Sequence, residues 1–250
     1  MLQINWILLY SLIFMGWVGL FIVVLTGSHF PIGIESDFQR IKSLLFTHPP
    51  MVNFGFILGM WSLMSVAMML PSFIPTLTVY NTLLTTGAGT HLGFWYLLGG
   101  YVFIWLAYSF GMASLQFQLM NLDVLGGHHH ENSLLKAILL GIAGGYQFSK
   151  FKDNCLTYCR NPLTLFLARG NVSPSMEFLT GLRLGLWCLG CCFFLMLLCI
   201  IAGVMNFFWM GLIAIIILLE KLPDIGQFVS RPLGVILIVL SLGTTWQYFN

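Results

Sequence analysis

Residues 181–199 read GLRLGLWCLGCCFFLMLLC and carry four cysteines within an otherwise apolar stretch. An α-helix has 3.6 residues per turn, so a helix here places Cys188, Cys192 and Cys199 on one stripe, with Cys191 beside it. Thiolates are the ligands that select Cu(I) and other soft metal ions. The spacing therefore predicts a soft-metal site formed by Cys188, Cys191 and Cys192.

A second pair of thiols stands in the stretch YQFSKFKDNCLTYCRNP (146–162), at Cys155 and Cys159. If this stretch is helical, residues four apart bring both sulfurs to one face. Lys152 and Arg160 flank the pair, and nearby positive charge favours the thiolate over the thiol. We therefore predict a second metal site at Cys155 and Cys159, at the cytoplasmic edge of the protein.

Methionines step by four in GFILGMWSLMSVAMMLP (55–71), at Met60, Met64 and Met68. Thioethers bind Cu(I) well, whereas they take no part in thiol–disulfide exchange. The ladder therefore favours a path for a soft ion, and these three residues are predicted to hand the ion along.

Two other functions remain open for the same residues. Cys188-Leu-Gly-Cys191 is a C-x-x-C sequence, which is typical of dithiols that cycle to a disulfide. A membrane thiol oxidoreductase would then exchange electrons between this pair and the pair at Cys155 and Cys159. Alternatively, the chain is a structural subunit of a membrane complex in which the cysteines only pack as small apolar residues.

The composition is that of a polytopic membrane protein. Of the 250 residues, 58% are hydrophobic and 7% are charged, with a mean hydropathy of +0.92. Soluble domains carry about 25% charged residues, so this chain cannot cover itself with a polar surface. The net charge of +2 indicates no nucleic-acid partner. No Ser-His-Asp set, P-loop or carboxylate pair is recognisable, so no catalytic residue is predicted and an enzyme is not favoured.

Hydropathy predicts an all-α bundle of about seven membrane spans, forming a single integral membrane domain over residues 1–250. The first span lacks a basic leader and a small-residue cleavage site, so we expect it to be retained. Segment 31–50 is predicted to form a short interfacial helix. The seven spans are expected at about 5–25, 52–70, 92–118, 133–149, 176–202, 204–220 and 233–249.

Loop charges predict the orientation of these spans, because cytoplasmic loops carry an excess of Lys and Arg. The face of the N-terminus carries six basic residues and the opposite face carries three, so the N-terminus is expected in the cytoplasm. The six are Lys150, Lys152, Arg160, Arg169, Lys221 and Arg231, and the three are Arg40, Lys42 and Lys136. The loop GGHHHEN (126–132), with His128 to His130, then lies outside, and its role stays open.

Several motifs occur in a fixed order along the chain. They are MWSLMSVAMMLP (60–71), YQFSKFKDNCLTYCRNP (146–162), GLRLGLWCLGCC (181–192), GVMNFFWM (203–210) and the pair Glu220-Lys221. Together they resemble a bacterial family of uncharacterised integral membrane proteins described as predicted metal-binding, over roughly residues 50–221. The chain departs from the family at Phe151, where a proline is typical, and at Phe193, where a tryptophan is often found.

The resemblance implies location in the bacterial inner (cytoplasmic) membrane and binding of a metal ion. Combined with the thiols and thioethers, it favours handling of a soft ion, with Cu(I) preferred over other soft metals. The expected partners are the lipid bilayer, the ion, and a membrane or periplasmic protein. Transport, sensing and loading of a copper enzyme remain alternatives.

Overall fold

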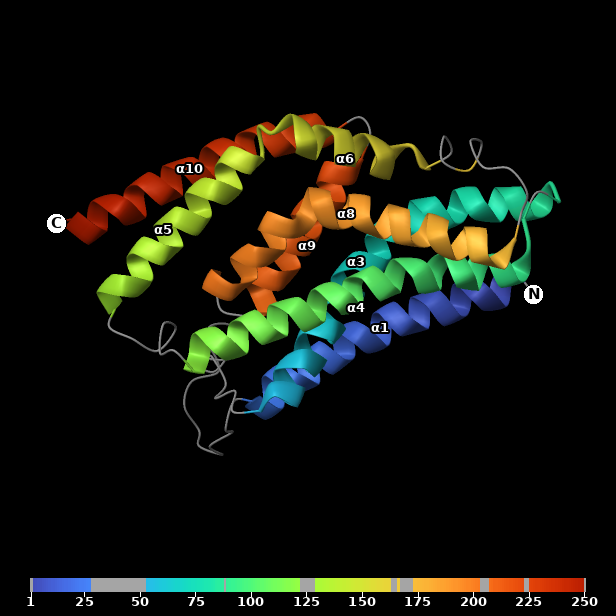
Figure 1. The fold of residues 1–250 in the computed structure, drawn as a ribbon, viewed down its shortest axis with the longest axis horizontal. Helices are drawn as coiled ribbons and strands as arrows, with labels where there is room; N and C mark the ends of the chain where they lie inside the picture. The colour runs from blue at the N-terminus through green and yellow to red at the C-terminus, as the bar shows by residue number, and fades with distance from the viewer. Residues whose placement is uncertain are drawn as a thin grey trace, which may run out of the picture.

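The computed structural model describes residues 2–27, 53–87, 89–121, 129–162, 166, 173–202, 207–222 and 225–249. Within these ranges the chain is all-helical, as predicted (Figure 1). The helices are α1 (Leu2–Gly27), α3 (Phe54–Thr85), α4 (His91–Asn121), α5 (His129–Tyr146), α6 (Lys150–Arg160), α8 (Pro174–Ala202), α9 (Phe207–Lys221) and α10 (Gly226–Phe249). The interfacial helix predicted at 31–50 and the loop residues 126–128 lie outside the described residues.

Helix α3 is longer than the sequence predicts. The second span was expected to end near residue 70, but α3 continues through Pro71 and Pro75 to Thr85. Each proline removes the backbone donor for the carbonyl four residues earlier, at Ala67 for Pro71 and at Pro71 for Pro75, and neighbouring helices make such a helix tolerable in apolar surroundings. Here the hydroxyls of Ser72 and Tyr101 donate to the Met69 carbonyl, at 2.8 and 3.1 Å. The proline-containing turn of α3 is thereby tied to α4.

Helices α4 and α8 run parallel and pack extensively against each other (Figure 1). Their contact is a glycine seam made by Gly100, Gly181 and Gly185. A Cβ on Gly100 would lie 2.2 Å from the Phe178 carbonyl oxygen, and one on Gly181 would lie 2.2 Å from that of Leu97. Because only glycine permits so close an approach of two backbones, the seam sets the position of α8 against α4.

Gly100→Ala is expected to destabilise the protein by about 1–3 kcal/mol, because the added methyl group would force α4 and α8 apart. Gly99→Ala is the matched control, since a Cβ there meets nothing within 4 Å. Thermal unfolding of the two variants in detergent micelles measures the difference. Equal stability of the two variants would contradict the close contact at Gly100.

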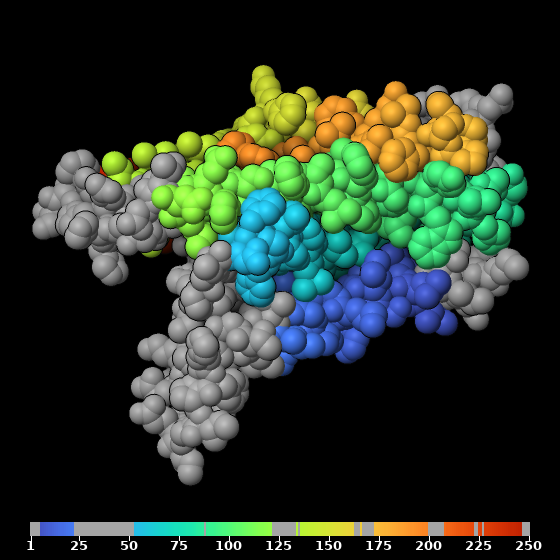
Figure 2. All heavy atoms as spheres, turned by 60° about the horizontal axis from the view of Figure 1, so that its bottom comes forward, coloured from blue at the N-terminus to red at the C-terminus, as the bar shows by residue number. Residues whose placement is uncertain are grey.

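The remaining helices surround this pair. Helix α1 packs on α3, while α5 and α10 pack on each other; α9 contacts α3, α8 and α10, and the short helix α6 lies on α8. Figure 2 shows α4, α3 and α1 side by side on one face of the molecule. The N-terminus and the turn between α3 and α4 lie at one end of the long helices, and the C-terminus lies at the other (Figure 1).

Among the described residues, four helices are long and apolar enough to cross a membrane. They are Phe54–Thr85, His91–Asn121, Pro174–Cys199 and Phe228–Trp246. Shorter apolar helices occur at Trp6–Ile22 and Lys136–Tyr146, and α9 has 15 residues. Large apolar side chains such as Phe14, Phe103 and Trp246 are exposed, and an exposed apolar surface of this kind is typical of contact with lipid or protein. Four spans meet the length criterion, and a total of seven stays a prediction.

Candidate metal centre

Helix α8 brings three cysteines together halfway along its length. The sulfurs of Cys188, Cys191 and Cys192 all lie within 4.8 Å of one another, and all three side chains are buried. Cys191 Sγ lies 3.2 Å from Cys192 Sγ and donates to the Cys188 carbonyl at 3.0 Å. Residues three and four apart are neighbours on one helix face, so the spacing alone suffices to gather these thiols. We call these three residues the thiol trio.

Two polar groups from other helices, Lys221 and Tyr101, contact Cys188, and Ser72 bonds to both of them. Lys221 Nζ, at the end of α9, donates to Cys188 Sγ at 2.9 Å and to Ser72 Oγ at 2.7 Å. The hydroxyl of Tyr101 lies 3.1 Å from Cys188 Sγ and 3.4 Å from Ser72 Oγ. An ammonium beside a thiolate compensates its charge where no water is present. The trio therefore sits at a junction of α3, α4, α8 and α9.

Sequence reasoning missed Lys221, Tyr101 and Ser72 as parts of the site. Lys221 was used only as one of the loop charges that predict the orientation in the membrane, although the pair Glu220-Lys221 belongs to the motif set. That pairing was the one available signal, because a lysine that closes a long apolar helix is usually read as an interfacial anchor. Nothing in the local sequence marks Tyr101 or Ser72.

The two cysteines of α6 lie in different surroundings. The side chain of Cys159 is hydrogen-bonded with Cys188 and Cys191, so it approaches the trio from a second helix. Cys155 is fully buried one turn away, but it packs on Gly190, where a Cβ would lie 2.8 Å from its sulfur. The structure therefore places Cys159 at the thiol trio and Cys155 behind the backbone of α8.

The prediction that basic neighbours favour thiolates at Cys155 and Cys159 is wrong. The hydrogen bond with Cys188, together with burial, raises the pKa of the Cys159 thiol well above its usual range. Burial likewise raises the pKa of the Cys155 thiol. Lys152 and Arg160 do not compensate, because both are engaged with Glu220, through its carboxylate and its carbonyl oxygen respectively.

This engagement fixes α6 on α9. Lys152 is fully buried, and its ammonium donates to both carboxylate oxygens of Glu220 at 2.8 Å and also to Gln147 Oε1. Arg160 donates to the Glu220 carbonyl at 2.6 and 3.2 Å. The ion pair and the arginine together hold α6, which carries Cys159, against the end of α9, which carries Lys221.

The methionine ladder lies on the buried side of α3, and Met60, Met64 and Met68 are all buried. The next residue in the same step of four is Ser72, which bonds to Lys221 beside Cys188. Since a helix rises 1.5 Å per residue, the ladder runs along α3 toward the thiol trio over roughly 18 Å.

Cys159→Ser is expected to weaken metal binding at the trio by roughly tenfold or more, because it removes the sulfur that contacts Cys188 and Cys191 from α6. Cys155→Ser, one turn away, leaves that set intact and is the matched control. Competition of each variant against a Cu(I) chelator measures the difference. A larger loss for Cys155→Ser would contradict the placement of the two thiols.

The fold and the site define an all-helical protein with long apolar helices and a buried cluster of three thiols. The chain belongs to a copper chaperone family: the family model PpoB2, described as a copper chaperone, matches residues 58–244. The match begins near the start of α3 and ends within α10, and it contains every predicted ligand. No curated protein and no solved structure matches the chain.

Proposed function

We propose that the chain is an integral membrane protein that binds Cu(I) at the thiol trio and passes it to a membrane or periplasmic protein. The observation that carries the proposal is the meeting of three buried sulfurs within 4.8 Å, in a chain of the copper chaperone family. An all-sulfur donor set suits a soft monovalent ion, whereas Mg²⁺ or Ca²⁺ would require oxygen ligands. The sulfur ligands therefore favour Cu(I) as the bound ion.

The charges around the trio also support a monovalent ion. Bare thiolates in an apolar core are costly, and a bound cation neutralises them. Lys221 already contributes one positive charge at 2.9 Å from Cys188 Sγ. With Lys221 charged, one Cu(I) and two thiolates make a neutral site, in which the third cysteine stays a neutral thiol. Cys159 supplies a further sulfur for exchange of the ion.

The methionine ladder and the membrane arrangement belong to the same proposal. Met60, Met64 and Met68 provide neutral thioethers through which the ion moves along α3 to the trio. The seven predicted spans put the two termini on opposite sides of a bacterial inner membrane, with the N-terminus in the cytoplasm. The position of the termini at opposite ends of the molecule supports an odd number of crossings (Figure 1).

The test is the metal content and coordination of the full-length protein, purified in detergent without oxygen. We expect at least one Cu(I) per chain, bound tightly against a chelator, and an X-ray absorption spectrum with sulfur ligands only. A metal-free protein whose Cys188–Cys191 disulfide turns over with a quinone would identify a thiol oxidoreductase instead. Growth that is unchanged by copper, together with lost assembly of a partner complex, would identify a structural subunit.

A further inference from the structure

Sulfur atoms continue along α8 beyond the thiol trio. Cys192 is followed by Met196 and Cys199, at steps of four and three, and all three side chains are almost completely buried. Positions with this spacing lie on one face of a helix. At 1.5 Å per residue, Cys199 stands about 10 Å beyond Cys192, and Met196 lies between them.

Helix α4 faces this stripe in a regular register. Ile104 contacts Gly185, and Tyr101 places its hydroxyl 3.1 Å from Cys188 Sγ. Because α4 and α8 are parallel, a tyrosine seven residues after Tyr101 faces α8 two turns further along. That residue is Tyr108, which lies within electrostatic range of the thiols of Cys199 and Cys192.

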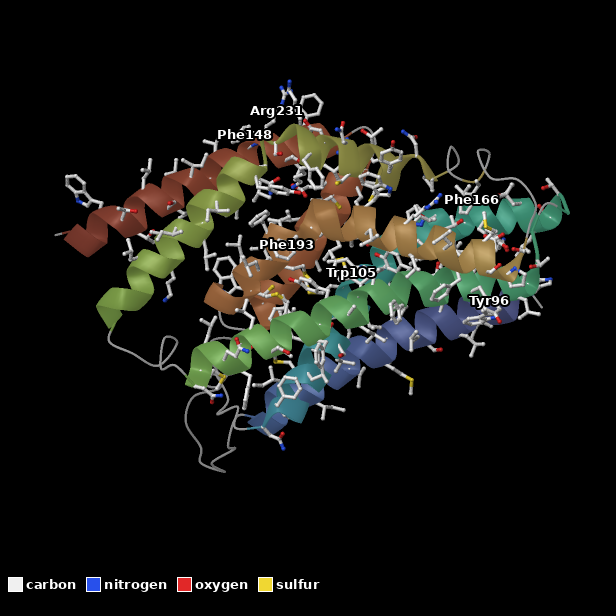
Figure 3. All side chains as sticks on the ribbon, viewed as in Figure 1. Tyr96, Trp105, Phe148, Phe166, Phe193 and Arg231 are labelled. Atoms are coloured by element: carbon white, nitrogen blue, oxygen red, sulfur yellow. The ribbon has the colours of Figure 1, made fainter. Side chains whose placement is uncertain are left out.

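Ring contacts fix the position of Tyr108. Its ring centroid lies 5.9 Å from that of Phe193 on α8 and 5.5 Å from that of Trp105 on its own helix. Figure 3 labels Trp105 and Phe193, which come from α4 and α8. The ring centroid of Tyr108 also lies 6.2 Å from that of Trp61 on α3, so Tyr108 is held where α3, α4 and α8 meet, next to the stripe.

The hydroxyl of Tyr108 has no hydrogen-bond partner in the part of the chain that the structure describes, and only 7% of the residue is exposed. A buried hydroxyl without a partner costs free energy, so native proteins rarely keep one without a role. Ordinary packing accounts for a buried cysteine and a buried methionine, but it does not account for this hydroxyl. Tyr101, in the equivalent position two turns earlier, has its hydroxyl on Cys188.

We propose that Cys199 and Met196 form a second binding site for a soft monovalent ion, Cu(I) or Ag(I), in which the unpartnered Tyr108 hydroxyl donates to the Cys199 thiolate once the ion is bound. One thiolate and one cation make a neutral pair, which suits an apolar surrounding without a lysine. Met112, one turn beyond Tyr108 on α4, is buried and offers a further thioether. The inference rests on the proposed function and extends it.

The second site extends the path of sulfur ligands along α8. Between the trio and Cys199 an ion passes Cys192 and Met196, in steps of about 4.5–6 Å along the helix axis. Each step exchanges one sulfur ligand for the next, so the ion does not cross the apolar core without ligands. Cys199 then stands toward the end of the molecule at which the methionine ladder of α3 begins, because Ser109, next to Tyr108, bonds to Ser65 and to the Trp61 carbonyl.

The experiment counts Cu(I) ions bound to the reduced full-length chain in detergent, without oxygen and in competition with a Cu(I) chelator. We expect two ions per chain for the unchanged protein and one for Cys199→Ala. Met196→Leu is expected to weaken the second ion, while Met176→Leu, an exposed methionine on the same helix, is the matched control and keeps both ions. Tyr108→Phe should weaken the second ion by roughly tenfold or more, because it removes a hydrogen bond to a charged sulfur.

The outcomes separate this inference from the proposed function. A single ion that is unaffected by Cys199→Ala overturns the second site and leaves the trio as the copper site. Two ions in both the unchanged protein and Cys199→Ala also overturn it, because the second ion then lies elsewhere. An unchanged protein without any bound Cu(I) overturns the proposed function itself. If Cys199→Ala does not fold, Met196→Leu and Tyr108→Phe, which nearly conserve volume, decide the question in the same way.

Discussion

Replacement of Cys188, Cys191 and Cys192 by serine is expected to remove the tightly bound Cu(I), with affinity falling by a factor on the order of a thousand or more. Serine has nearly the shape of cysteine, but its hydroxyl oxygen is a poor ligand for a soft ion. The triple variant therefore removes the ligands while changing the packing of α8 little. Competition with a Cu(I) chelator gives the affinity of the tightest ion.

The control for the triple variant is Leu189→Ser, which adds a hydroxyl within the same turn of α8 and keeps every sulfur. We expect this variant to bind the tight ion as the unchanged protein does, even if it is somewhat less stable. Tight binding by the triple variant would show that the ion is held elsewhere. In that case the close approach of the three sulfurs would be a packing feature.

Glu220→Gln is expected to destabilise the protein by about 3–5 kcal/mol, because it leaves the buried ammonium of Lys152 without its counter-charge. The glutamine keeps an acceptor for Lys152, and the bonds from Arg160 go to the backbone of residue 220, so the substitution isolates the charge. Denaturant unfolding in detergent micelles measures the loss. Cu(I) affinity should fall as well, since the same network positions Lys221 and Cys159.

The double variant Lys152→Met, Glu220→Met provides the internal check. Two apolar side chains in place of a buried ion pair are often neutral or stabilising, so most of the lost stability should return. Lys150→Met, at an exposed position on the same helix, is the matched control and should change stability by less than about 0.5 kcal/mol. A Glu220→Gln variant as stable as this control would mean that the ion pair does not hold α6 on α9.

The fold class was predictable because the apolar runs and the low charge leave few alternatives to packed helices. The ends of the helices were less predictable, and α3 is the clearest case. Its span was predicted to end near residue 70, yet the helix runs on to Thr85. Packing against α4 supports this proline-containing turn, where the Tyr101 hydroxyl donates to the Met69 carbonyl.

The sequence also did not predict which side of each helix faces its neighbours. A helix that is apolar on all sides has no polar face to show which side turns inward. Helices α3 and α4 are of this kind, so neither the approach of Ser72 nor that of Tyr101 to Cys188 follows from their spacing. By contrast α6 has a polar side, and the sequence predicted that Cys155 and Cys159 lie on one helix. It did not predict that Cys159 lies at the thiol trio while Cys155 packs on Gly190.

The amino-acid sequence by itself determined the helices and the thiol trio, because both depend on local geometry: backbone hydrogen bonds within a segment, and spacings of three and four residues on α8. Only the tertiary structure decided which groups meet that trio. Lys221, Tyr101, Ser72 and Cys159 come from four other helices, and glycine contacts and a buried ion pair set how closely those helices approach. Such distances depend on the packing of side chains far apart in the chain, so no local pattern encodes them.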